Sequence, residues 1–182
     1  MAVYINVVGD QPDFGSLPAA KIIDYPLEKR DYRPFAQAQL ALGLEALFVR
    51  MIAFEAHPDP GSRLWLLLGL REGCFCLSAA GDGSIQLLPP MPDARAHRIG
   101  GEDLQGVFWG TECALPRARL EALLGRALRP GDALQGNVLK TSTGGEMPPH
   151  FGCLYPCREV YALKDAGALT PESLGEFLIV GY

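Results

Sequence analysis

Short apolar runs, each closed by turn-forming residues, constrain what this chain can fold into more than any other feature. Glycine (21) and proline (15) make up about a fifth of its 182 residues, above the ~12% of average usage. The runs recur at intervals of about 8–12 residues, which is typical of a β-sandwich. The predicted strands include Leu47–Glu55, Leu64–Leu70, Cys74–Ala80, Ile85–Leu88, Val107–Leu115, Leu134–Thr141 and Val160–Leu163. We therefore predict an all-β chain, an immunoglobulin-like β-sandwich that forms a single domain over residues 1–182.

Two short helices are predicted within this pattern. The segment Pro116–Arg126 begins with proline, which suits the first turn of a helix. Its leucines recur at the i, i+3, i+4 spacing of one helical face (Leu120, Leu123 and Leu124). Thr170 and the proline that follows it form a cap and a helix start, so we expect a second helix over residues 171–177.

Two segments are expected to be surface loops. Pro89–Ile99 is polar and rich in proline, and Ser142–Tyr155 is long, polar and rich in glycine and proline. Such composition favours turns over regular elements.

The charge balance and the apolar runs exclude two classes of partner. The chain has 16 basic and 21 acidic residues, a net charge of −5, and no basic cluster of the kind that nucleic acid requires. Runs such as Leu64–Leu70 are far shorter than the ~18–20 residues of a membrane span. Met1–Asp10 lacks the pattern of a secretory signal, and the odd number of cysteines, five, favours reduced thiols. We therefore expect a cytoplasmic protein without nucleic-acid or membrane partners.

Catalytic and metal-binding motifs are not found in the sequence. It has no G-x-S-x-G, no phosphate-binding loop and no G-x-G-x-x-G before a helix. Cys153 and Cys157 lie near His150, which would suit a thiol nucleophile or three ligands of a zinc site. Structural zinc sites use four ligands, and cysteines in a strand-rich domain are usually small buried hydrophobes. We expect no metal, and a protein that is not an enzyme.

One segment combines the groups that sugars require. Leu134–Thr141 and the following Pro148–Pro156 bring together an amide, a cation, a hydroxyl, an imidazole and an aromatic ring, namely Asn137, Lys140, Thr141, His150 and Tyr155. Such groups suit sugar hydroxyls and ring faces. The alternative is a loop whose polar groups satisfy its own backbone.

The same segment resembles family-9-like carbohydrate-binding modules. "LQGNVLKTSTGGEMPPHFGCLYPC" is similar to a strand R/W-x-N-x-x-K followed by a P-H-F-G-S-W-x-P loop. "DYRPFAQAQLAL" with "LFVRMIAFEAHPDP" resembles an early Y-R-P element that leads to A-x-L and V-R-x-x-x-x-E. "GVFWGTECALPRARLEALLG" resembles a W-x-x-E-x-x-I-P strand and its helix. "LTPESLGEFLIV" resembles a terminal P-E-x-F-G-x-L-x-L element.

The resemblance implies a β-sandwich that binds saccharides non-covalently, with calcium in some members. Carried over by position, the site residues are Asn137, Lys140, His150 and Phe151 from the late motif and Trp109 and Glu112 from the W-x-x-E strand, with Tyr155 as a further aromatic. Leu154 stands where the family loop has an aromatic. The acidic D-S-C-x-E-F-F stretch is missing, since Gly61–Trp65 leads directly into "LLLGL". We expect no cofactor, with calcium as the open alternative.

Three functions follow as hypotheses. The first is a non-catalytic module for a small saccharide or glycan, in which Asn137 and His150 contact hydroxyls, Lys140 donates, and Phe151 or Tyr155 stacks. The second is a degenerate β-sandwich that serves as an interaction or oligomerisation scaffold, including a homo-oligomer, through the apolar run "LWLLLGL". The third is an enzyme that uses His150 or Cys153.

Overall fold

The computed structural model describes residues 2–26, 28, 35–143, 149–157 and 173–181. Its strands are β1 (Val3–Val7), β2 (Ala20–Ile22), β3 (Ala36–Leu42), β4 (Ala46–Ala53), β5 (Arg63–Gly69), β6 (Cys74–Ala80), β7 (Ile85–Leu88), β8 (Arg95–Asp103), β9 (Gly106–Pro116), β10 (Ala133–Ser142), β11 (His150–Cys153) and β12 (Gly175–Val180), and its helix is α1 (Arg117–Leu124). The all-β prediction is confirmed.

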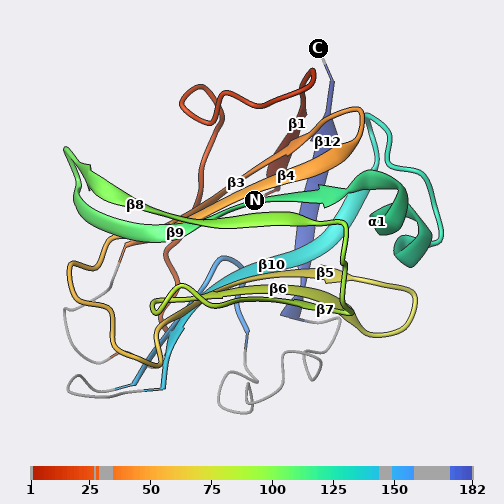
Figure 1. Ribbon diagram of the computed structural model, residues 1–182. Helices are drawn as coiled ribbons and strands as arrows, with labels where there is room; N and C mark the ends of the chain where they lie inside the picture. The colour runs from red at the N-terminus through yellow and green to blue at the C-terminus, as the bar shows by residue number, and fades with distance from the viewer. Residues whose placement is uncertain (1, 27, 29–34, 144–148, 158–172, 182) are drawn as a thin grey trace.

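The described strands pair into one 12-stranded sheet that bends into two facing layers. The strand order is β7-β6-β5-β10-β12-β1-β3-β4-β9-β8, with β11 on β10 and β2 on β3. Figure 1 shows β3, β4, β9 and β8 in one layer, β10, β5, β6 and β7 in the other, and the steep strands β1 and β12 between them. The pairs of β1 with β12 and with β3 are parallel, whereas neighbouring strands within each layer are antiparallel.

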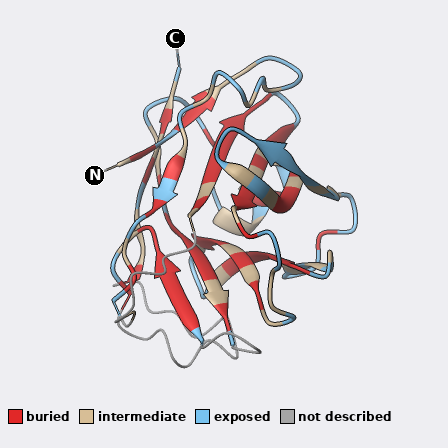
Figure 2. Ribbon diagram, turned by 90° about the vertical axis from the view of Figure 1, so that its left-hand side faces the viewer, coloured by how far each residue is buried: buried red, intermediate tan, exposed pale blue. Residues whose placement is uncertain are grey.

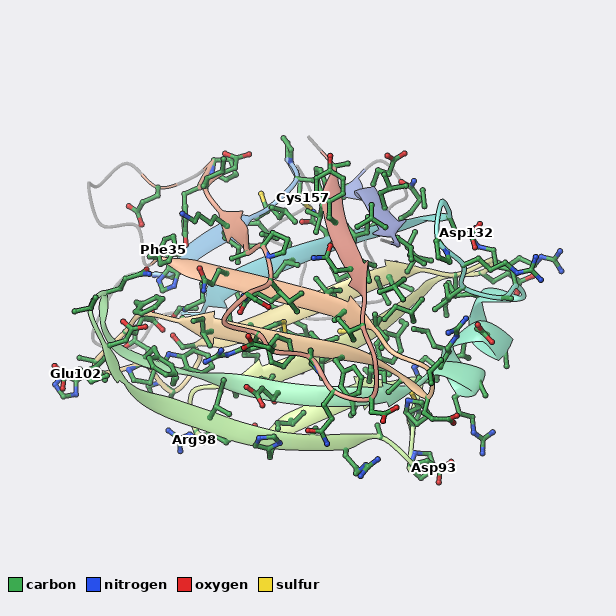
Figure 3. All side chains as sticks on the ribbon, turned by 90° about the horizontal axis from the view of Figure 1, so that it is seen from above. Phe35, Asp93, Arg98, Glu102, Asp132 and Cys157 are labelled. Carbon is green, nitrogen blue, oxygen red and sulfur yellow. The ribbon has the colours of Figure 1, made fainter. Side chains whose placement is uncertain are left out.

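The main core lies between the two layers. In β5, alternation directs Leu64, Leu66 and Leu68 inward, where they are fully buried with Phe75 of the neighbouring strand β6 and Met51 of β4 in the opposite layer. Figure 2 shows buried residues along the strands of both layers, and Figure 3 shows side chains filling the molecule between its two ends.

A second, smaller apolar cluster lies on the outer face of β5 and β10. It consists of Leu67, Cys76, Leu139, Phe151, Cys153 and Cys157, with Trp65 and Leu174 packed against it. Strand β11 covers this face by pairing with β10, with Thr141 opposite Phe151 and Leu139 opposite Cys153. The cluster therefore attaches the predicted ligand segment to the outside of the sheet.

Several predicted elements are confirmed. The runs Leu47–Glu55, Leu64–Leu70, Cys74–Ala80, Ile85–Leu88, Val107–Leu115 and Leu134–Thr141 form strands β4, β5, β6, β7, β9 and β10 with small shifts at their ends. The predicted helix Pro116–Arg126 is α1. It ends at Gly125, whose φ of 68° is left-handed and suits a residue without a Cβ.

The expected helix near the C-terminus differs from the structure. The expected helix over 171–177 is wrong, because Gly175–Val180 is strand β12; residues 171 and 172 lie outside the described residues. Phe177 and Ile179 alternate inward there, and pairing with β1 and β10 overrides the local helix signal. The predicted strand Val160–Leu163 lies outside the described residues.

The two expected loops contain strands. The end of Pro89–Ile99 belongs to β8, and the end of Ser142–Tyr155 contains β11. β8 is mostly exposed and polar, and Figure 3 labels Arg98 and Glu102 along it. An edge strand with few buried residues lacks the apolar alternation by which strands are predicted.

Candidate functional site

A lysine is buried with a carboxylate between the two layers. Strand β10 alternates so that Lys140 faces inward on the same side as Val138, opposite Leu64 of β5. Its Nζ lies 3.1 Å from Oε1 of Glu55, and the side chains are 0% and 4% exposed. A buried ammonium requires such a partner, because an unpaired charge away from water is costly.

Ser62, Trp109 and His150 surround this pair. We call the five residues, Glu55, Ser62, Trp109, Lys140 and His150, the Lys140 cluster. Lys140 Nζ lies 3.1 Å from Ser62 Oγ and 2.9 Å from His150 Nε2. The other carboxylate oxygen, Glu55 Oε2, accepts hydrogen bonds from Trp109 Nε1 at 3.0 Å and from Ser62 Oγ at 3.3 Å. Because an ammonium has only donors, Nε2 of His150 accepts from it and the imidazole proton lies on Nδ1.

The environment shifts the protonation of Lys140. Burial lowers the pKa of Lys140 below its ordinary value, and the carboxylates of Glu55 and Asp59 offset part of this effect. The cluster joins Trp109 of β9, Lys140 of β10 and His150 of β11 to the segment between β4 and β5 that contains Glu55 and Ser62. It therefore fixes β5, β10 and β11 relative to the opposite layer.

Asn137 has a different role in the structure. Its Nδ2 donates to the carbonyl oxygens of Tyr155 at 3.0 Å and Ser173 at 2.7 Å. Its Oδ1 accepts from the backbone N–H of Val138 at 2.8 Å and of Tyr155 at 3.1 Å. The amide is fully buried, so it fastens two later segments to β10.

The aromatic residues of the predicted site also pack within the protein. Tyr155 donates its hydroxyl to the carbonyl of Glu176 at 2.6 Å, and its ring lies 6.1 Å from that of Phe177. Phe151 is buried in the outer apolar cluster. Neither ring stands free as a platform at this end of the molecule.

Glu112 lies apart from the other predicted residues. It is on the outer face of β9, 3.5 Å from Arg50 Nε and 3.6 Å from His97 Nε2. The structure thus brings Lys140, His150 and Trp109 together, joins Asn137 to Tyr155, and leaves Phe151 and Glu112 in separate surroundings. Direct contact of these seven residues with a ligand stays a prediction.

Sequence reasoning missed Glu55 and Arg63. Glu55 was the last residue of a predicted strand and of the V-R-x-x-x-x-E element, which was the available signal. Trp65 alternates outward on β5 and is half-buried, and its Nε1 donates to Thr141 Oγ1 at 2.9 Å. The guanidinium of Arg63 lies 5.9 Å from the centre of its ring. We call Arg63, Trp65 and Thr141 the Trp65 surface.

Metal ligands do not gather in the described part of the chain. Among these residues, no group of three or more His, Cys, Asp and Glu side chains could hold a metal ion. Likewise, no helix in that part is long and apolar enough to cross a membrane.

Comparison with known proteins gives a structural match only. No family model matches the chain, and no curated protein matches its sequence. A family 9 carbohydrate-binding module from Caldicellulosiruptor kristjanssonii in complex with glucose is similar over 100% of this chain and 97% of its own, at 9% identity and a TM-score of 0.68. A module of that family and organism in complex with cellotriose is similar over 100% and 95%, at 11% identity and a TM-score of 0.61.

A third structure agrees with these two. It is a candidate carbohydrate-binding protein from Bacteroides uniformis ATCC 8492, similar over 98% of both chains at 12% identity and a TM-score of 0.65. The chain thus has the β-sandwich fold of family 9 carbohydrate-binding modules over its whole length, as the sequence resemblance predicted.

Proposed function

We propose that this protein is a single-domain, non-catalytic module that binds a small saccharide. The observation that carries the proposal is the full-length fold match to modules that hold glucose and cellotriose. The binding mode is reversible and non-covalent, and it requires no cofactor.

The Trp65 surface is where we place the saccharide. The half-buried indole leaves part of its ring accessible for contact with a sugar ring, with the Arg63 guanidinium over it. Arg63 presents N–H donors beside it, and Thr141 Oγ1, which accepts from Trp65, keeps its own proton for a sugar hydroxyl. Buried Lys140 and His150 act from below by holding β5, β10 and β11 in place, and Asn137 holds the Tyr155 segment.

The protonation of the thiols supports a role without catalysis. Burial raises the pKa of Cys153 to about 12, so its thiolate is scarce near neutral pH. A nucleophilic cysteine needs the opposite shift. Lys140 and His150 are engaged with one another and lie beneath the surface.

Calorimetric titration tests the proposal. Glucose and cellotriose are titrated into the full chain, into Trp65→Ala and into Leu104→Ala, which removes an exposed apolar side chain from the β8–β9 turn of the other layer. Stacking worth about 1 kcal/mol corresponds to roughly a fivefold to tenfold loss of affinity in Trp65→Ala. Leu104→Ala should bind like the wild type. Absence of heat from either sugar in the wild type would contradict the proposal.

The second candidate is an interaction or oligomerisation scaffold in the form of a homo-oligomer. The burial of five predicted ligand residues favours it, namely Trp109, Asn137, Lys140, His150 and Phe151. A scaffold would bind no sugar and would elute as a complex larger than one chain. Light scattering after size-exclusion chromatography, on the samples used for calorimetry, separates the two candidates.

A further inference from the structure

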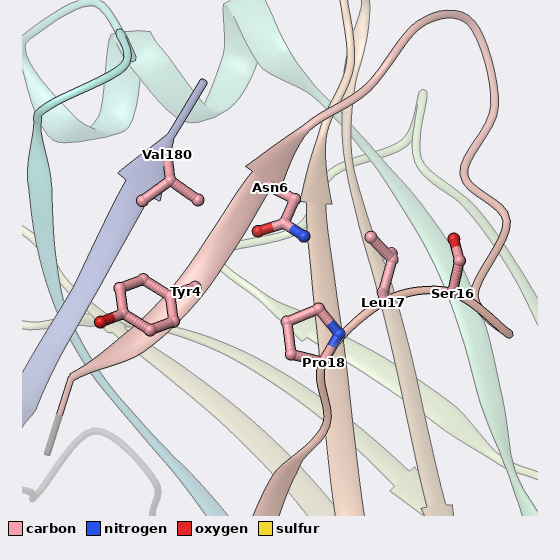
Figure 4. A pocket seen from close by; sticks show the side chains of 6 residues that line it. All are labelled: Tyr4, Asn6, Ser16, Leu17, Pro18 and Val180. Carbon is pink, nitrogen blue, oxygen red and sulfur yellow. The ribbon is translucent and has the colours of Figure 1, made fainter. Parts of the chain in front are cut away.

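A hollow lies on the outer face of β1 and β12, away from the Trp65 surface. Its volume is about 540 Å³, within the range of small-molecule sites. Figure 4 shows its lining residues: Tyr4 and Asn6 of β1, Val180 of β12, and Ser16, Leu17 and Pro18 of the segment that crosses β1. The hollow therefore lies between two strands and a connecting segment.

The segment that forms one wall is held in place by a buried side chain. Gln39 of β3 donates from Nε2 to the carbonyl oxygens of Phe14 at 2.6 Å and Leu17 at 2.8 Å. Asp13 closes the turn before the wall, because its Oδ1 accepts from Gly15 N–H at 3.0 Å. The wall is thus anchored to the sheet before any ligand arrives.

Asn6 is a buried polar group that faces the hollow. It lies between Val180 of β12 and Ala41 of β3 in the sheet register, and the residue is only 7% exposed. Figure 4 shows its side-chain amide directed toward Pro18. Among the described residues, no hydrogen bond is made by this amide, and its atoms are not among the fully buried ones that lack a partner, so the amide is accessible from the hollow.

The rest of the lining indicates the class of ligand. Tyr4 is 50% exposed and offers an aromatic face. Leu17, Pro18 and Val180 supply apolar contacts, and Ser16 adds a hydroxyl oxygen. The lining contains no ionisable group other than the phenol, so it offers nothing to balance a charged ligand. A neutral ring that carries hydroxyl groups matches the amide, the hydroxyl and the aromatic face together.

We propose that this hollow is a second binding site, for one neutral sugar unit. Asn6 donates to one sugar hydroxyl through Nδ2 and accepts from another through Oδ1, and Tyr4 stacks on the ring. The assignment goes beyond the site at the Trp65 surface and uses none of its residues, so either site can exist without the other.

An NMR titration of the isotope-labelled full chain tests the proposal. Glucose is the probe, and glucuronate is the charged counterpart of the same size. In the wild type, ~10 mM glucose, ten times a Kd of about 1 mM, should shift the side-chain amide of Asn6 and the ring of Tyr4 saturably. Glucuronate should bind at least tenfold more weakly. The shifts at Asn6 should persist in Trp65→Ala.

Two variants separate a ligand contact from a structural role. Asn6→Leu keeps the volume but removes the amide that faces the hollow, so it should abolish the glucose shifts at Tyr4 and Val180 without lowering the melting temperature. Tyr4→Ala removes a half-exposed ring and should weaken binding at Asn6 at least fivefold while the fold is retained. Glucose shifts in Asn6→Leu that match the wild type would overturn the proposal.

The outcomes distinguish failure here from failure of the proposed function. If Asn6 does not respond to ~10 mM glucose, the amide serves only as a water site and the proposal is overturned, whatever happens at Trp65. If Asn6 responds and Trp65 does not, the second site stands and the placement at the Trp65 surface fails.

Discussion

Lys140 Nζ and Glu55 Oε1 lie 3.1 Å apart between the two layers, and water reaches almost nothing of either side chain. A residue at a predicted ligand position is thus part of the internal support of the fold. The pair joins β10 of one layer to the segment that follows β4 of the other. Its strength sets how firmly the strands beneath the Trp65 surface are held.

Lys140→Met should destabilise the protein by about 3–5 kcal/mol, because it leaves the Glu55 carboxylate buried without its counter-charge. Urea unfolding measures the loss. The double variant Glu55→Gln with Lys140→Met removes both charges and should recover much of the stability.

The control for this pair is Glu112→Gln, which breaks the half-exposed pair with Arg50. Surface ion pairs contribute about 0–1 kcal/mol, so this variant should unfold close to the wild type. An equal loss in Lys140→Met and Glu112→Gln would mean that the buried pair contributes no more than a surface pair.

Asn137→Ala should lower the free energy of unfolding by roughly 1–3 kcal/mol, because it leaves the buried backbone groups of Tyr155 and Ser173 without their partners. Thermal and urea unfolding both report this loss. Hydrogen exchange should rise first at Tyr155, whose N–H donates to the amide. Unchanged exchange there would contradict the anchoring role.

Stability should fall with rising pH between pH 9 and about 12. Burial raises the pKa of Cys76, Cys113 and Cys153 from 9.0 to about 12. The unfolded chain then loses these thiol protons first and binds fewer protons than the folded chain, so stability declines in this window. Lys140 works in the opposite direction, because burial lowers its pKa.

Comparison with Cys113→Ala isolates the thiol contribution. Urea unfolding across this pH range should give a shallower decline in the variant than in the wild type, since Lys140 is the same in both. Parallel curves would show that the Cys113 thiol does not titrate differently in the two states.

Thiol labelling near neutral pH should be slow at Cys153 and faster at Cys74, the half-buried cysteine. Reaction requires the thiolate and access to it, and Cys153 lacks both in the folded chain. Mass spectrometry after brief exposure to Ellman's reagent measures the order. Rapid labelling of Cys153 would favour the thiol-enzyme hypothesis.

The sequence predicted the strands that have a buried apolar face. Leu64–Leu70 and Cys74–Ala80 were predicted as strands from their apolar composition, and α1 was predicted as a helix from the spacing of its leucines. β8 was missed because its side chains are mostly exposed, and β12 because a local cap signal competed with pairing to β1. A local sequence pattern does not reveal which distant strand a segment will pair with.

The candidate site was predicted in part. Lys140 and His150 were expected to act together, and they lie 2.9 Å apart, but as buried groups. The alternation of β10 predicts an inward Lys140, because residues two apart in a strand face the same side and Val138 faces inward. A lysine is normally assigned to the solvent face, and only the carboxylate of Glu55, distant in sequence, makes burial affordable.

The parallel pairing of β1 with β12 has a consequence for synthesis on the ribosome. Val3 pairs with Phe177, and Asn6 with Val180. Strand β1 therefore cannot form this pairing until β12, the last described strand, has been synthesised. Pairings so distant in sequence form slowly. The two layers are joined through these strands, and the hollow beside Asn6 includes Val180. A nascent chain therefore lacks the connection between the layers and the hollow beside Asn6 until β12 has left the exit tunnel.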